Sequence, residues 1–182
     1  MLLSLLALPI VGQVVGVYLI SKLMLAAIGI FEVKKEKLQL PAPTRQTWEV
    51  SAEELSKILK EHKRWLATDR NEGEKADLSY ANLSYANLSS ANLSEADMSV
   101  TILVCANLSE ANLSEANLGG ANLGGANLNK ADLTEASLYG AYLFGAVLNS
   151  ANLSEANLRG ANLIYADLSE VLGLNIEQLS EV

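Results

Sequence analysis

Alanine and leucine return at every fifth residue over more than half of the chain. Residues 76–170 form 19 consecutive pentapeptides, in which the first position is Ala 18 times and the third is Leu 18 times. The exceptions are Thr101 and Met98. A period of five fits neither an α-helix, which repeats every 3.6 residues, nor a β-strand, which alternates every two. Such repetition is typical of a solenoid, in which each unit buries its apolar side by stacking on its neighbours.

Each pentapeptide must turn a corner to return Ala and Leu to the interior, and four corners close a square. One coil then takes 20 residues, so the 95 residues of the repeat predict about five coils. Asn and Asp dominate the second position, where their side chains can bond to nearby backbone at the turns. Residues one coil apart should lie one above another, about 4.8 Å apart.

Helix signals flank the repeat. Ser51 and Glu54 form a capping box, which predicts a helix beginning at Ala52. We expect an N-terminal capping helix and lead-in over 51–75 and a C-terminal cap over 171–182, where Asn175 and Gln178 indicate a second helix start. The first helix has one apolar face, formed by Leu55, Ile58, Leu59, His62, Trp65 and Leu66. The His on this face is expected to be an ordinary hydrogen-bonded histidine.

Residues 1–31 carry a single charged side chain, Lys22. As a helix, residues 2–20 would span about 29 Å, close to the thickness of a bilayer's hydrocarbon core. We predict a single-pass transmembrane anchor over 1–31. A cleaved signal peptide is the alternative, but no basic region precedes the apolar run. Because the basic residues follow this segment, the positive-inside rule places the repeat on the cytoplasmic side.

Two smaller features accompany the anchor. Gly12 and Gly16 are four residues apart, a spacing that lets a partner helix approach closely and predicts a homodimer contact in the membrane. The alternative is that they are two small residues in an apolar helix. Residues 32–50 mix charges with the sequence PAPT, which predicts a linker with neither helix nor strand.

The stretch ADLSYANLSYANLSSANLSEADM, residues 76–98, resembles the pentapeptide-repeat family. The resemblance implies an all-β fold, a right-handed quadrilateral parallel β-helix with short capping helices, here preceded by the transmembrane helix. Residues 59–78 resemble the helix-capped start of cyanobacterial members. VLGLNIEQL, residues 171–179, resembles their closing segment, so both ends of the coil are expected to be covered.

Composition excludes several kinds of chemistry. The chain has one Cys and one His, which leaves no intrachain disulfide and no thiolate metal cluster. A filled square coil has no cleft that could gather a nucleophile, a base and an orienting group. We therefore expect no enzyme activity, no metal and no cofactor.

The net charge of −8 is concentrated on the repeat, while residues 1–75 are mildly basic. This acidity argues against nucleic acid as a partner. At 20 residues per coil, four glutamates form one column: Glu95, Glu115, Glu135 and Glu155. This column is expected to be a solvated surface, and a cation-binding stripe is the alternative.

The irregular apolar residues of the repeat fall on one side of the predicted square. One wall collects Tyr85, Ile102, Val104, Tyr142, Phe144, Ile164 and Tyr165. The adjoining wall adds Tyr80, Val100 and Tyr139. Gly124 and Gly125 should lower the surface between them into a shallow groove. Such a strip predicts a protein contact site. The alternatives are coverage by residues 32–50 or the end of the anchor, and plain exposure of side chains that favour strand packing.

These features predict a membrane-anchored, non-catalytic scaffold that docks a protein partner, as a subunit of a larger membrane complex. Resemblance to anchored members in photosynthetic bacteria implies a thylakoid or plasma membrane. The alternative is a DNA mimic that acts on a topoisomerase, as in family members that protect gyrase from quinolones. Those members dimerise through an aromatic C-terminal module, whereas this chain ends in NIEQLSEV.

Overall fold

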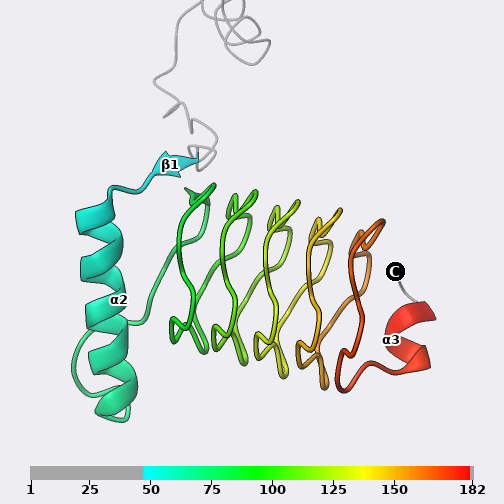
Figure 1. The fold of residues 1–182 in the computed structure, drawn as a ribbon. Helices are drawn as coiled ribbons and strands as arrows, with labels where there is room; N and C mark the ends of the chain where they lie inside the picture. The colour runs from blue at the N-terminus through cyan, green and yellow to red at the C-terminus, as the bar shows by residue number, and fades with distance from the viewer. Residues whose placement is uncertain (1–46, 181–182) are drawn as a thin grey trace, which may run out of the picture. The chain divides into compact units, whose positions relative to one another are not determined.

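The computed structural model of the chain describes residues 47–180 (Figure 1). Its elements are β1 (Trp48–Glu49), α2 (Ala52–Ala67), β2 (Ala81–Asn82) and α3 (Ile176–Ser180). Between β2 and α3 the backbone alternates single bridging residues with turns. The predicted anchor lies outside the described residues, as does the predicted linker up to residue 46. Within 47–180, neither helix is long and apolar enough to cross a membrane.

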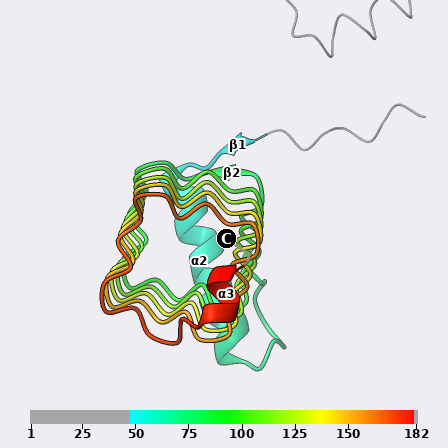
Figure 2. The ribbon, with the colours of Figure 1, turned by 90° about the vertical axis from the view of Figure 1, so that its right-hand side faces the viewer.

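Parallel bridges join each coil to the next at the predicted interval of 20 residues. Asn82 bridges Ile102, Ile102 bridges Asn122, and the interval continues to the pair Asn152 and Leu172. Seen along their axis, the coils superimpose in a four-sided outline (Figure 2). We call the four sides wall D, wall A, wall B and wall C, and they begin at residues 76–80, 81–85, 86–90 and 91–95. Each wall also contains the pentapeptides that follow its first one at intervals of 20 residues.

The interior of the coils is filled by the alanine and leucine columns. The third-position side chains between Leu78 and Leu158 are at most 3% exposed. Thr101 occupies an inward alanine position, where its Oγ1 donates a 2.7 Å hydrogen bond to the Leu78 carbonyl. The exception to the repeat therefore buries a satisfied hydroxyl and leaves the coil unbroken.

The corners are held by the side chains of the second position. The Oδ1 atom of Asn82 accepts the N–H of Ser84 at 3.1 Å, and Asn112 does the same for Ser114 at 3.0 Å. From Ala81 onward, the residue before each alanine of the repeat has positive φ, as at Glu115 (φ 57°), which is the third position of a type II turn. The asparagines thus satisfy turn amides locally, as predicted.

The N-terminal cap begins where the sequence predicts. Ser51 Oγ accepts the N–H of Glu54 at 3.1 Å, and α2 starts at Ala52. His62 is fully buried, and its Nδ1 accepts the N–H of Ala76 at 3.1 Å. The expected hydrogen bond of this histidine is confirmed at Nδ1, whereas its buried Nε2 has no hydrogen-bond partner within the described part of the chain.

The end of the predicted linker requires a correction. Residues 32–50 were expected to contain neither helix nor strand, but Trp48 and Glu49 form β1, which pairs in parallel with Ala81 and Asn82 of β2. The Trp48 backbone N–H donates to Tyr80 O at 3.1 Å, and its indole N–H donates to Ser79 O at 3.0 Å. The first coil has no preceding coil, so this extended segment satisfies carbonyls that would otherwise remain open.

The C-terminal cap contains the predicted reciprocal pair. The N–H of Asn175 donates to Gln178 Oε1, and the N–H of Gln178 donates to Asn175 Oδ1, both at 2.9 Å. Gln178 Nε2 also donates to the carbonyls of Leu153 and Ala156, at 3.0 and 2.8 Å. The cover is partial, because Leu172 beside it is 60% exposed.

Candidate docking surface

The bridges bring the predicted apolar residues onto the expected walls. Ile102 and Tyr142 both bridge Asn122, so they lie two coils apart on wall A. Phe144, Ile164 and the other members of the strip belong to the same wall by the 20-residue interval. The placement of the strip agrees with the sequence analysis. Its role in binding stays a prediction.

Three rings on wall A are joined by contacts to Phe144, and we call Tyr142, Phe144 and Tyr165 the aromatic cluster. The ring centroids of Tyr142 and Phe144 are 6.0 Å apart and stacked, and those of Phe144 and Tyr165 are 5.3 Å apart, edge to face. Tyr165 is 82% exposed, and the other two rings are about 40% exposed. The cluster is continued by Ile164, which is also exposed. These rings therefore pack on each other outside the core.

The remaining residues of wall A differ in exposure. Ile102 and Val104 are half-buried, whereas Tyr85 on the first coil is 77% exposed. The apolar strip is thus most accessible at its two ends.

The paired glycines of the predicted groove have side chains of neighbouring coils beside them, and the groove itself stays a prediction. A Cβ atom on Gly124 would lie 3.7 Å from Cε1 of Tyr142, so the ring of the next coil leans over this glycine. A Cβ atom on Gly125 would lie 3.3 Å from Sγ of Cys105 in the coil before. Gly124 is half-buried beside Tyr142, whereas Gly125 remains exposed.

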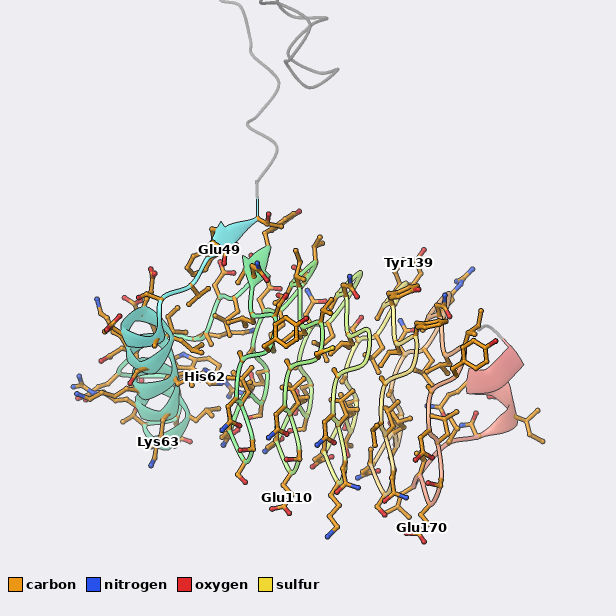
Figure 3. The ribbon with its side chains drawn as sticks, turned by 45° about the horizontal axis from the view of Figure 1, so that its top comes forward. Glu49, His62, Lys63, Glu110, Tyr139 and Glu170 are labelled. Carbon is orange, nitrogen blue, oxygen red and sulfur yellow. The ribbon has the colours of Figure 1, made fainter. Side chains whose placement is uncertain are left out.

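Wall D carries a smaller apolar contribution. Val100 and Tyr139 are exposed, but Tyr80 is half-buried beside β1, to which its carbonyl is bonded. Tyr139 lies on the same side of the coils as Glu49, whereas Glu110 and Glu170 lie on the opposite side (Figure 3). The exposed ring of Tyr139 is therefore on the side of the coils opposite to these two glutamates (Figure 3).

The glutamate column on wall C is not uniform. Arg70, which follows α2, places Nη2 2.5 Å from Oε1 of Glu95, so the first carboxylate is paired with the cap. Sequence analysis missed this pair because the two residues are 25 positions apart without a shared pattern. Within residues 47–180, no group of three metal-ligating side chains occurs.

The comparisons with known proteins concern the repeat. A family model described as "Pentapeptide repeats" matches residues 74–109, 106–143 and 141–171. The comparison with curated proteins gave no match.

Solved structures resemble the same region. A pentapeptide repeat protein from the Arabidopsis thaliana thylakoid lumen is 27% identical, with 58% of this chain and 72% of that chain covered and a TM-score of 0.55. Rfr23 from the cyanobacterium Cyanothece 51142 is 32% identical over 57% of this chain, with a TM-score of 0.43. The match spans 63% of Rfr23, less than two thirds of its length. HetL from Nostoc sp. strain PCC 7120 is 41% identical, over 54% of this chain and 52% of its own, with a TM-score of 0.24.

Proposed function

Because this chain belongs to the pentapeptide repeat family, we propose that it is a non-catalytic scaffold whose wall A docks a protein partner. The proposal includes a right-handed winding of the coils, as expected for this family. The observation that carries it is the aromatic cluster, in which Phe144 packs against both Tyr142 and Tyr165 while all three rings remain exposed.

The chemistry of the cluster supports a protein contact. Tyrosine and phenylalanine bring a large rigid area at low entropic cost, and tyrosine is enriched among the residues that dominate binding energy. Phe144 is already held between Tyr142 and Tyr165. Docking would therefore bury preordered rings and would lose little side-chain freedom.

Membrane attachment is a separate part of the proposal. We place the anchor at residues 1–31 and the repeat on the cytoplasmic side of a thylakoid or plasma membrane, as a subunit of a larger membrane complex. The Arabidopsis protein comes from a thylakoid lumen, which supports a thylakoid membrane but favours the other side of it. Deleting residues 1–31 should move the protein to the soluble fraction, and unchanged fractionation would contradict the anchor.

Site-specific crosslinking tests the docking surface. Benzoylphenylalanine in place of Tyr142 should crosslink one protein in the membrane fraction of the source cells, and the same probe in place of Glu115 on wall C should not. Phe144→Ser should reduce the yield strongly, because a central aromatic anchor contributes roughly 2 kcal/mol, about thirtyfold in affinity. Equal crosslinking from both walls, or none from Tyr142, would refute docking on wall A.

The DNA-mimic alternative has one supporting observation, the carboxylates of Glu115, Glu135 and Glu155 along wall C. A gyrase supercoiling assay with the full chain separates the two functions. Inhibition that is lost on substitution of these glutamates by Gln would favour the mimic, and no inhibition would exclude it.

A further inference from the structure

A pocket lies at the other end of wall A, where α2 meets the first coil. It has a volume of about 580 Å³, within the range of natural ligand sites. One side is formed by Val50, Leu55 and Leu59, and the other by residues 82–87. The pocket is thus bounded by apolar side chains of the cap helix and by the open edge of the first coil.

Backbone groups at this edge are unpaired. In the next coil, Asn107 donates its N–H to Ala86 O at 2.9 Å and accepts from the Leu88 N–H at 2.7 Å. The corresponding N–H and C=O of Asn87 have no hydrogen-bond partner among residues 47–180, nor does the carbonyl of Ser84. All three groups belong to residues that line the pocket.

The chain itself shows what this edge accepts. β1 pairs in parallel with Ala81 and Asn82, immediately before the unpaired groups. The pairing then stops, because Ser51 caps α2 and turns the chain away from the edge. An edge that already pairs with an extended segment therefore continues, unpaired, into the pocket.

We propose that the pocket binds an extended peptide segment of a protein partner. The segment donates N–H groups to the carbonyls of Ser84 and Asn87, accepts the Asn87 N–H, and places one aliphatic or aromatic side chain between Leu55, Leu59 and the coil. Glu49 is the one charged residue among the lining residues, and its Oε1 accepts from Asn82 Nδ2 at 2.8 Å. This carboxylate selects a neutral or basic segment over an acidic one.

The site goes beyond the proposed function. It lies at the first coil, whereas the aromatic cluster lies on the last two coils of wall A, and it stands even if the cluster binds nothing. Its recognition also differs, because backbone hydrogen bonds supply affinity and a single side chain supplies specificity.

Defined peptides test the proposal on the full chain labelled with ¹⁵N. The probes are acetyl-Lys-Thr-X-Thr-Lys-amide with Leu, Phe or Trp at X, and their backbone N-methylated forms. At least one unmodified probe should bind with a dissociation constant below about 1 mM. It should slow amide exchange at Asn87 but not at Asn92, an edge amide on wall C that does not line the pocket. N-methylation should weaken binding at least tenfold.

A matched pair of variants locates the site. Ser56→Trp should fill the pocket from α2 and weaken binding at least tenfold, whereas Lys57→Trp changes an exposed residue of the same helix outside the lining and should not. No binding by any probe, equal binding of the N-methylated form, or full binding by a folded S56W chain would each overturn the proposal. If S56W fails to fold, the N-methylated comparison on the unaltered chain decides. None of these results depends on Phe144, so they leave the docking test independent.

Discussion

The alignment of outward residues can be tested by removing parts of the repeat. Deleting residues 106–125 removes one whole coil, and deleting 121–125 removes a single pentapeptide. Both deletions preserve the inward alanine and leucine columns, so both chains should fold. They differ in register, because the five-residue deletion moves every later residue from its own wall to the preceding one.

Disulfide formation with the native Cys105 can report which residues lie one coil away from it. Residue 145 is two coils beyond it on wall A, about 9.6 Å away at the usual strand spacing, whereas residue 125 is one coil, about 4.8 Å, away. A disulfide requires Cα atoms about 4.4–6.8 Å apart. A Cβ atom on Gly125 would lie 3.3 Å from the Cys105 Sγ, which permits the bond. Cys105 itself has φ 54°, so cysteine is tolerated at these positive-φ positions.

The expected pattern is therefore specific. Gly125→Cys should form a disulfide with Cys105 in the complete repeat, and Gly145→Cys should not. Gly145→Cys should form the bond after deletion of 106–125 and remain reduced after deletion of 121–125. Mass spectrometry of alkylated thiols under glutathione oxidation reads the outcome. A bond in the five-residue deletion, or none in the coil deletion, would refute the stacking of wall A at 20-residue intervals.

Three further predictions concern stability. Thr101→Ala restores the repeat's alanine but should lower the free energy of unfolding by about 2 kcal/mol, because a buried hydrogen bond and a buried methyl are lost; guanidinium unfolding measures this, and an unchanged midpoint contradicts it. Burial lowers the pKa of His62 from 6.5. The unfolded chain therefore binds the proton first, and stability should fall as pH drops below about 6.5; the same pH slope in His62→Gln would exclude this cause. Gln178→Ala should speed amide exchange in the last coil, because two carbonyl contacts are lost, whereas Ile176→Ala, at a side chain 85% exposed, should not.

The repeating part of the fold could be predicted because its information is local and periodic. The inward columns fix the 20-residue interval, and the turn asparagines fix each corner within two residues of themselves. The caps at Ser51 and Gln178 are likewise recognised within a span of four residues. The fold expected from the family resemblance and the structure agree at these positions because the turns and caps depend on hydrogen bonds between residues close in sequence.

What could not be predicted depends on contacts between distant segments. β1 is two residues long, has no periodicity, and pairs with a segment more than 30 residues later. The pair of Arg70 and Glu95 joins the cap to wall C. The position of the Tyr142 ring beside Gly124 of the preceding coil likewise could not be read from the sequence. Exposure of wall positions is thus set by neighbours one coil away.

The stretch from Val100 to Cys105 shows how fold and surface are separated in this chain. The inward residue of this stretch is Thr101, whose buried hydroxyl donates a hydrogen bond to the Leu78 carbonyl. The departure from alanine at this position therefore leaves the coil intact. Val100 has φ 56°, a conformation that costs a β-branched residue roughly 1 kcal/mol or more, and it is 42% exposed. Glycine, which the chain uses at the same turn position in Gly120, would avoid this cost. The backbone N–H of Val100 bonds to the Gly119 carbonyl, as any residue's would, so the identity of its side chain matters through the surface it presents. Residues that lower stability without serving the core are expected at functional surfaces, which is the physical reason to seek the partner on this side of the coils.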